Sequence, residues 1–381
     1  MKKLAINALS ALRGGGQTNI INLLNYLPKY NTSIILILNS NNYNLFKKFK
    51  SNKVILHEAK FASKTIFHRF YWEKFVLPSK LKLWGIDIFY APGGTLITKV
   101  PKKCIGITTL QNMLPFEDIE RKRFPFFSFI RYKLLFLKYI FIKSYIRADK
   151  IIFISNYSRS IIEKIIPNIK DKSTTIPLGI SDSFLNSKLN YKLPKNLIGD
   201  DFYLYVSQFD YYKSQKQIIY TWKALIDKGF KRKLVFVGSK FNKYGDESLS
   251  LIKELNLENF VIYLGFVKYQ ELPSLYKSAF SLIFASTCEC CPNTLLEMLS
   301  FKKPIFCSNW GPMPEFGEDG VIYFDPHLKN DLKNKILNLQ HNNSLIKSYS
   351  EKSFNLSKKY NFEQTILKNI NYILKEKHEN V

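Results

Sequence analysis

The chain has 381 residues, of which 46% are hydrophobic and 23% are charged, and its formal net charge at pH 7 is +27. This composition excludes an intrinsically disordered chain, and the length suits two domains better than one. The positive charge predicts an anionic partner, such as nucleic acid, anionic lipid or a phosphorylated substrate. The five cysteines lack the spacing of a disulfide framework, which favours a reducing compartment.

The start of the chain, MKKLAINALSALRGGG, resembles a signal peptide only briefly. Its apolar part is short, and Arg13 and three glycines follow where a secretory signal would continue. We therefore expect a strand, a glycine loop and then a helix from about Thr18. No run reaches the roughly 18 uncharged apolar residues that a membrane-spanning helix needs. The nearest candidate, 124–146, contains Lys and Arg side chains throughout.

Short apolar runs recur along the whole chain and are separated by stretches with helical spacing. Most of the runs lack polar alternation, which is typical of parallel strands that are buried on both faces. The pattern predicts an α/β fold with two doubly wound parallel sheets. The predicted strands are 4–7, 33–38, 54–59, 86–91, 104–110, 150–155 and 174–179 in the first half, and 202–207, 233–238, 261–266, 280–285, 304–308 and 321–325 in the second.

A polar segment, 181–201, separates the two sets of predicted strands and is interrupted by Pro194 and Gly199. The end of the chain has apolar residues at helical spacing, among them Ile366 and Ile370. The predicted parts are an N-terminal Rossmann-like domain over 1–182, a linker over 183–200, a C-terminal Rossmann-like domain over 201–358 and a terminal helix within 359–381.

The residues that follow the predicted strands are the candidates for chemistry, because open parallel sheets bind ligands outside the C-terminal ends of their strands. In the first half, Gly15 and Gly16 precede a predicted helix. Glycines at that place let backbone N–H groups approach a phosphate, although a plain tight turn is an alternative. Gln111 and Asn112 follow the strand at 104–110, where they either face a ligand or cap a local turn.

In the second half, two loops carry charged side chains. Lys213 lies near a helix start, where it can bind an anion or remain a solvated surface lysine. Glu289 lies in a loop above a strand end, and Pro292 is suited to the first turn of the helix that follows. Glu297 then lies inside that helix. The backbone N–H groups of Asn293 and Thr294 are expected to point toward Glu289, which predicts an anion site beside a carboxylate.

Cys288, Cys290 and Cys291 raise the alternative of a metal site. A structural zinc ion needs four ligands at compatible spacing, and no histidine is close to this cluster in the sequence. We therefore expect no metal here and interpret the thiols as small buried side chains. None of the histidines lies in a catalytic motif, and we expect them to be structural or exposed; they are His57, His68, His327, His341 and His378.

Taken together, several segments resemble the group 1 glycosyltransferases, retaining sugar-nucleotide enzymes of the GT-B fold. The segment 285–326 is similar to the E-x7-E element of that family and the strand that follows it, and 203–219 to its phosphate-binding loop. Further similarity covers 265–286, 147–158 and 176–180. The resemblance implies two Rossmann-like domains that face each other across a cleft, and a final helix that crosses back to the first domain.

The resemblance also implies roles for individual residues. Glu289 would contact the hydroxyls of the donor sugar and support an oxocarbenium-like transition state. Glu297 would bind the ribose hydroxyls. Lys213 would neutralise the donor diphosphate, which the N–H groups of Asn293 and Thr294 would also bind.

Other loops would complete the donor site. The loops that begin at Gly238 and at Gly265–Phe266 would hold the base. Gly15 and Gly16 would let the first domain approach the phosphates. No cofactor or metal is implied apart from the nucleotide diphosphate sugar, which is a co-substrate.

The sequence departs from the family pattern in three ways. Gln208 stands where an arginine is usual, so one positive charge is missing, and Lys216 is a possible substitute. Pro292 stands at a usual glycine position, where it removes one N–H donor. Gln111 and Asn112 stand where a histidine is often found near the donor sugar.

The segment 121–150 contains nine Lys or Arg residues and nine aromatic residues against one acid. Cations and stacking rings suit nucleic acid, whereas Lys, Arg, Phe and Tyr together suit the headgroup boundary of a membrane. A core helix with a solvated basic face is the third interpretation. We favour an anionic membrane surface, because no known nucleic-acid module is present.

The sequence thus predicts a metal-independent, retaining glycosyltransferase. It would move a hexose from a nucleotide diphosphate sugar to a glycan or lipid-linked acceptor, in the synthesis of cell-surface polysaccharide or lipopolysaccharide. We expect a cytoplasmic protein, peripheral on the inner face of the cytoplasmic membrane, that does not bind nucleic acid. The alternatives are a sugar-nucleotide epimerase or hydrolase of the same fold and, less favoured, a basic nucleic-acid-binding protein.

Overall fold

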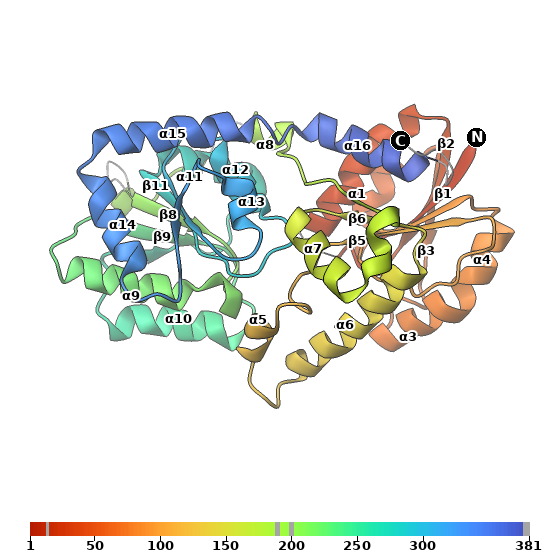
Figure 1. Cartoon of the computed structure of the whole chain (residues 1–381), viewed down its shortest axis with the longest axis horizontal. Coiled ribbons are helices and arrows are strands. Elements are labelled where there is room, and N and C mark those ends of the chain that lie inside the picture. Colours follow the sequence, from red (N-terminus) through yellow and green to blue (C-terminus); the bar gives the residue numbers. More distant parts are fainter. Residues whose placement is uncertain (13–14, 187–190, 198–201, 376–381) are drawn as a thin grey trace. The chain divides into compact units, whose positions relative to one another are not determined.

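A computed structural model describes residues 1–12, 15–186, 191–197 and 202–375 (Figure 1). The chain divides into two compact units. The first unit consists of Met1–Phe116, Phe127–Pro177 and the terminal segment that begins at Glu363. The second unit consists of Glu117–Phe126 and Leu178–Phe362.

The prediction of 1–182 as one continuous domain is therefore wrong for residues 117–126. This segment belongs to the second unit. The reason is local packing: Glu120 and Phe124 are buried, and Phe124 lies edge-on to Tyr211 of the second unit. Charge and aromatic content along 121–150 gave no sign of this division.

The first unit contains, within the described residues, a seven-stranded sheet in the order β3-β2-β1-β4-β5-β6-β7, and every pairing is parallel. Its inner strand β1 pairs Leu4 with Ile34 on one side and Ile88 on the other, and these side chains are buried. The strands are β1 Lys2–Asn7, β2 Thr32–Leu38, β3 Val54–Glu58, β4 Ile88–Ala91, β5 Ile105–Leu110, β6 Lys150–Phe153 and β7 Ser173–Thr175.

Helices connect these strands, and several begin at a side-chain cap. The Ser155 hydroxyl accepts a hydrogen bond from the backbone N–H of Ser158 at the start of α7, and Ser128 plays the same part for α6. The helices of the first unit are α1 Gly15–Tyr26, α2 Ser40–Phe46, α3 Ile66–Tyr71, α4 Leu77–Leu83, α6 Phe129–Arg147, α7 Asn156–Ile165 and α16 Phe362–Leu374, with a π-helical turn at Trp72–Val76 between α3 and α4.

The terminal helix predicted within 359–381 is α16. Its last turn is joined to the rest of the first unit, because Lys2 Nζ donates to the carbonyl of Leu374 at 2.8 Å and the Tyr372 hydroxyl donates to the carbonyl of Lys172 at 3.1 Å. The predicted linker, 183–200, contains most of the short helix α8 Asp182–Leu185 and a 3-10 turn at Lys195–Leu197. Residues 187–190 and 198–200 of that linker lie outside the described residues.

The second unit contains a six-stranded parallel sheet, as far as its residues are described, in the order β10-β9-β8-β11-β12-β13. Counted from β8, this is the order 3-2-1-4-5-6 of doubly wound dinucleotide-binding folds, and the first six strands of the other unit follow it too. The strands are β8 Phe202–Val206, β9 Lys233–Val237, β10 Val261–Tyr263, β11 Ser281–Phe284, β12 Ile305–Ser308 and β13 Ile322–Phe324.

In Figure 1, α9 and α10 lie on one side of this sheet, and α12 and α15 on the other. That arrangement follows from the right-handed crossovers of parallel strands. The helices of the second unit are α5 Asp118–Lys122, α8, α9 Gln215–Ile226, α10 Lys243–Glu254, α11 Leu272–Ser278, α12 Asn293–Leu299, α13 Met313–Gly317, α14 Asp331–Gln340 and α15 Asn343–Ser357.

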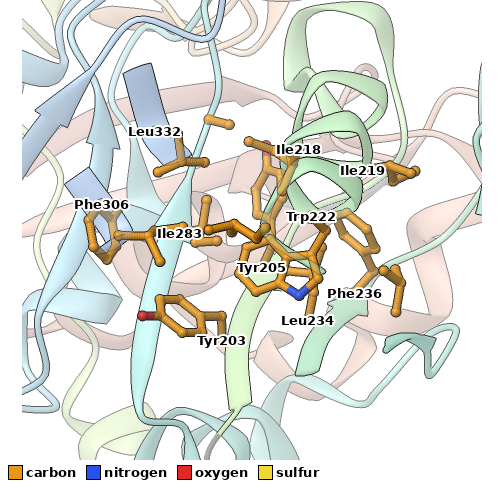
Figure 2. Close-up of a cluster of buried hydrophobic side chains, with 14 of the residues drawn as sticks. Tyr203, Tyr205, Ile218, Ile219, Trp222, Leu234, Phe236, Ile283, Phe306 and Leu332 are labelled. Carbon is orange, nitrogen blue, oxygen red and sulfur yellow. The ribbon is translucent and has the colours of Figure 1, made fainter. Parts of the chain in front are cut away.

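A cluster of buried aromatic and aliphatic side chains holds α9 against the second sheet (Figure 2). Trp222 of α9 is fully buried, packs edge-on to Tyr203 of β8, and donates from Nε1 to the carbonyl of Arg232 at 3.1 Å. Truncation of a buried side chain of this size costs about 3–5 kcal/mol of unfolding free energy. The core therefore gives the ends of the strands, where the candidate site lies, a rigid support.

Among the described residues, no helix is long and apolar enough to cross a membrane.

Candidate active site

The C-terminal ends of neighbouring strands in the second unit bring three loops together. Gly238, directly after β9, has a φ of +145°, and a Cβ atom there would lie 2.0 Å from the carbonyl oxygen of Ser207, after β8. The N–H of Gly238 donates to the carbonyl of Gly265, after β10, at 2.8 Å. Glycine is needed at this position because the three loops are in backbone contact.

Lys213, in the loop after β8, and Glu289, in the loop after β11, form an ion pair, with Nζ of the lysine on Oε1 of the glutamate. Only 12% of the lysine side chain and 18% of the glutamate side chain are exposed. The ammonium group also lies 5.7 Å from the ring centre of Phe284. A pair that is withheld from water in this way interacts more strongly than a surface pair.

Local turns position Lys213. It is the last residue of a 3-10 turn, Tyr211–Lys213, whose first N–H donates to the side chain of Asp210 at 2.8 Å. Burial raises the pKa of Asp210, while hydrogen bonds and the charges of Lys213 and Arg123 lower it by less. Ser214 then takes a left-handed conformation, with a φ of +56°, before α9 begins. The backbone at Lys213 is thus held by a cap on one side and a helix on the other.

Thr287 joins the loop of Glu289 to the loop of Lys213. Its backbone N–H donates to the carbonyl of Tyr212 at 2.8 Å, and its hydroxyl donates to the same oxygen at 3.1 Å. Both partners are adjacent or nearly adjacent to the ion pair in the sequence. These two hydrogen bonds therefore fix the distance between the two charged residues.

Glu297 lies in α12, which follows the loop of Glu289. The Tyr269 hydroxyl donates to Oε1 of Glu297 at 2.9 Å. Burial raises the pKa of Glu297 to about 7, and the hydrogen bond from Tyr269 lowers it by less. The sequence reasoning missed Tyr269, for which the only signal was its place in the loop after a strand.

The start of α12 differs from the prediction in one respect. Pro292 is the residue before the helix, and the N–H of Asn293 donates to the carbonyl of Cys291 at 3.0 Å. The expectation that this N–H points freely toward an anion is therefore wrong, because the turn at Pro292 already uses it. The N–H of Thr294 has no hydrogen-bond partner within the described part of the chain.

Gln208 binds within its own loop. Its Nε2 donates to the hydroxyl of Tyr212 at 3.3 Å, and its carbonyl accepts from Gln215 Nε2 at 2.8 Å. Lys216, the possible substitute for a missing arginine, is paired with Glu247 at 2.6 Å. Donor binding by Gln208 stays a prediction, and Lys216 is engaged elsewhere in this structure.

Phe266 follows Gly265 and is 73% exposed, next to the ends of β9 and β10. Gly265 has a φ of +72°, and no atom lies within 4 Å of the place where its Cβ would be. An exposed ring beside an open glycine is suited to stack on a planar ligand, so the proposed contact of this loop with a base stays a prediction.

In the first unit, Gly15 and Gly16 are the first residues of α1, so the expectation of a helix that begins only near Thr18 is wrong. A Cβ on Gly16 would lie 3.8 Å from Oε1 of Gln111, which places these two predicted residues beside each other. Gln111 Nε2 is buried without a hydrogen-bond partner in the described structure. Asn112 accepts from the N–H of Leu114 at 3.1 Å, which is the turn-capping alternative.

The three cysteines of the Glu289 loop are buried, as the interpretation of small buried side chains requires. Burial raises the pKa of each of these thiols, so they remain neutral. Over the described ranges, no group of three or more His, Cys, Asp and Glu side chains could hold a metal ion.

Two exposed sets of aromatic residues lie in the first unit. On α6, Phe129, Phe136 and Tyr139 are 80%, 60% and 59% exposed, and Lys133 and Lys143 are exposed among them. This differs from a core helix with only its lysines in water. The sequence reasoning missed the second set, on α3, α4 and the turn between them, where the exposed aromatic members Phe67, Phe70, Tyr71 and Phe75 are joined by the exposed aliphatic Ile66 and Leu83.

These two sets form what we call the aromatic–basic face. The β3-to-β4 and β5-to-β6 connections run in the same direction along the sheet order, so right-handed crossovers place α3, α4 and α6 on the same face of the first sheet. The exposed lysines Lys74 and Lys82 lie in the second set. Its one carboxylate, Glu73, is buried and paired with Arg69 at 3.2 Å.

The two parallel sheets, their shared strand order and the loops at the strand ends define a protein of the GT-B class, as predicted. Residues 192–356 match the family described as "Glycosyl transferases group 1". This segment is therefore similar to the group 1 glycosyltransferases.

Curated proteins show the same resemblance. An uncharacterised glycosyltransferase of Methanocaldococcus jannaschii is 25% identical over 240 residues, which are 60% of each chain. The O-antigen chain mannosyltransferase B of Escherichia coli is 24% identical over 230 residues, 59% of this chain and 60% of the relative. The chain thus spans 60% of the length of these curated relatives.

A solved structure is similar over almost the whole chain. The crystal structure of Anabaena HepE in complex with UDP-glucose aligns with a TM-score of 0.70 at 16% identity, over 98% of this chain and 99% of that one. At this level of identity the likeness concerns the fold.

Proposed function

We propose that this protein is a retaining glycosyltransferase that moves a hexose from a nucleotide diphosphate sugar to a glycan or lipid-linked acceptor. The observation that carries the proposal is the shielded Lys213–Glu289 pair at the strand ends, with Glu297 in the helix that follows. The family match supports it, as does the UDP-glucose bound to the Anabaena protein of the same fold.

In the proposed reaction, the bond between the anomeric carbon and the phosphate oxygen breaks, and its electron pair stays on the nucleoside diphosphate. The oxygen of the acceptor hydroxyl forms the new bond on the same face of the sugar, and its proton passes to the leaving diphosphate. Lys213 would stabilise the negative charge of the leaving diphosphate, so that the site does not depend on a metal ion for this charge.

The free protein holds Lys213 neutralised by Glu289. A bound diphosphate would compete for the ammonium group and release the Glu289 carboxylate toward the hydroxyls of the donor sugar. Glu297 would accept hydrogen bonds from the ribose hydroxyls. Tyr269, which donates to Glu297 in the free protein, would then keep this hydrogen bond beside the ribose or give it up to a ribose hydroxyl. The pair would thus keep the site ordered until the donor arrives.

The aromatic–basic face supports a lipid-linked acceptor. Exposed rings and lysines together suit the headgroup region of an anionic bilayer, where rings enter the interface and cations meet lipid phosphates. We propose that the protein works at the inner face of the cytoplasmic membrane, in the synthesis of surface polysaccharide or lipopolysaccharide. The name of the E. coli relative, an O-antigen chain mannosyltransferase, supports this setting.

The first test is thermal unfolding of the purified protein with a panel of nucleotide diphosphate sugars. At least one donor should raise the midpoint, and Lys213→Ala and Glu297→Ala should weaken this response. Lys243→Ala is the matched control, because Lys243 is an exposed lysine of the same unit with 85% of its side chain in water. The proposal is wrong if no nucleotide diphosphate stabilises the protein.

A second test identifies the reaction. The protein is incubated with the stabilising donor, with and without lipid extract, and the products are measured by mass spectrometry. A glycosylated lipid or glycan that forms only with extract supports the transferase. Free nucleotide that accumulates equally without any acceptor would instead indicate an epimerase or hydrolase of the same fold.

A further inference from the structure

We propose that the segment 117–126 braces the two loops of the Lys213–Glu289 pair, with Glu120 and Phe124 as positioning residues. The segment precedes α6 in the chain, yet it packs in the second unit. Its importance for catalysis rests on the function proposed above, whereas its effect on the two loops does not.

The segment is itself well ordered by short-range contacts. The guanidinium of Arg123 contacts Oε2 of Glu120 at 3.0 Å, and that of Arg121 contacts Asp118 at 2.7 Å. Glu120 is 2% exposed and Arg121 is 8% exposed, so these charges are held inside the protein. A buried charge lowers the stability of the fold unless it is paired, so these ion pairs indicate that the short helix is held in one defined position.

Glu120 is linked electrostatically to Thr287 and Cys288 of the loop that carries Glu289. Its Oε1 lies 3.8 Å from Nε2 of His327, and the Thr287 hydroxyl is close enough to affect its ionisation. Burial raises the pKa of Glu120, but His327, Thr287 and Arg123 together lower it below its ordinary value. The ionisation of Glu120 is therefore linked to Thr287, the residue whose two hydrogen bonds join the Glu289 loop to Tyr212.

Phe124 faces the loop that carries Lys213. The ring is 4% exposed and lies edge-on to Tyr211, with the ring centres 5.2 Å apart. Tyr211 packs in turn on Tyr244 of α10 at 4.9 Å and begins the 3-10 turn that ends at Lys213. Tyr211 is thus packed between Phe124 of the segment 117–126 and Tyr244 of α10.

Glu120 and Phe124 thus each act on one of the two loops that carry the ion pair. Each half lies on an irregular loop, and such loops open at a lower free energy than the strands beneath them. A brace on both loops keeps the two charged groups in fixed positions relative to each other, which an electrostatic site requires. If the segment only filled space, its removal would lower stability throughout the unit and would not select these loops.

Amide hydrogen exchange of the full-length protein tests the brace. Glu120→Gln keeps the shape of the side chain and removes its charge, and Phe124→Ala removes the ring. We expect exchange in 207–214 and 285–291, including the Thr287 amide, to become at least about tenfold faster in each variant, while β9 exchanges at the wild-type rate. Ile119→Ser is the matched control, because Ile119 lies on the same short helix and is 59% exposed.

Unchanged exchange in both loops of the Glu120→Gln protein, or equal acceleration in β9, would overturn the brace. If the chain binds no nucleotide diphosphate at all, the exchange result still decides the brace, while the proposed function fails separately. If it does bind the donor, the same variants should weaken donor affinity at least about tenfold, and the Ile119→Ser protein should match the wild type. Wild-type donor affinity in a variant with loosened loops would refute the positioning role.

Discussion

The ammonium group of Lys213 is paired with a carboxylate oxygen of Glu289, 76 residues further along the chain. Both side chains are largely shielded from water, and Thr287 ties their two loops together. A shielded pair of this kind makes predictions that do not depend on the identity of any ligand.

Loss of one partner should cost more than loss of both. Lys213→Met leaves a shielded carboxylate without its cation, and we expect the unfolding free energy to fall by about 2–4 kcal/mol. Lys213→Met combined with Glu289→Gln should recover part of that loss, because no unpaired charge remains. Urea denaturation of the two single variants and the double variant measures the coupling. Strictly additive losses would show that the pair contributes no interaction energy of its own.

Glu297 should make stability depend on pH in a defined direction. Its pKa is raised from an ordinary 4.5 to about 7 in the folded protein, so the folded state holds the proton more tightly than the unfolded state does. The Glu297 contribution is therefore fully present below the unfolded pKa and is lost as the pH rises toward the folded value.

The comparison with Glu297→Gln isolates this contribution. As the pH rises from about 5 to about 8, the unfolding free energy of the wild type should fall relative to that of the variant. Most of this fall should come before the pH reaches about 7. Chemical denaturation at a series of pH values gives the difference directly. Parallel curves for the two proteins would show that Glu297 titrates normally.

Two glycines at neighbouring strand ends should respond differently to alanine. Gly238→Ala would place a Cβ 2.0 Å from the carbonyl oxygen of Ser207, so the loops must separate. Gly265→Ala meets no atom within 4 Å and carries only the strain of its positive φ. We expect losses of about 3 kcal/mol or more for Gly238→Ala and about 1 kcal/mol for Gly265→Ala. Similar losses in both variants, by thermal or urea unfolding, would contradict the close approach of the loops.

The aromatic–basic face should bind anionic vesicles. Sedimentation with phosphatidylcholine vesicles that contain phosphatidylglycerol should retain the protein, and high salt should weaken the binding because lysines meet lipid phosphates. Replacing Phe129, Phe136 and Tyr139 by serine should weaken binding at least about tenfold, since each ring loses a buried apolar contact.

Tyr220→Ser is the control for this face, because Tyr220 is 56% exposed but lies on α9 of the second unit. Its binding should equal that of the wild type. If the triple variant binds vesicles as well as the wild type does, these aromatic residues do not contact the membrane. If the protein binds double-stranded DNA in preference to vesicles, the nucleic-acid interpretation is favoured.

Hydrophobic runs along the chain were sufficient to predict the strands of both sheets and their parallel arrangement. Each predicted run corresponds to a strand in the structure, because a parallel strand buried on both faces must be almost continuously apolar. The order of the strands and the contacts between loops were beyond these patterns. Gly238 shows this well: its position after a strand is visible in the sequence, but its close approach to Ser207 is not.

The charged residues of the site show the same division. The positions of Lys213, Glu289 and Glu297 after strands and in a helix were visible in the sequence, and the order of their neighbouring motifs pointed to the family. Their partners were not visible, because hydrogen bonds such as Tyr269 to Glu297 and ion pairs such as Lys216 to Glu247 join residues that are distant in sequence. The hydrogen bond from the N–H of Asn293 to the carbonyl of Cys291 likewise depends on a turn geometry that residue types alone do not specify.

Periodicity, glycine and proline positions and motif order were thus enough to predict the class of fold and the resemblance to a family, because these features are written in local patterns, while the chemistry of the loops stays a prediction. The tertiary structure alone assigned 117–126 to the second unit and placed Glu120 beside His327. It also showed which aromatic residues remain exposed. The physical reason is that burial and pairing depend on which distant segments meet, and local spacing does not encode that choice.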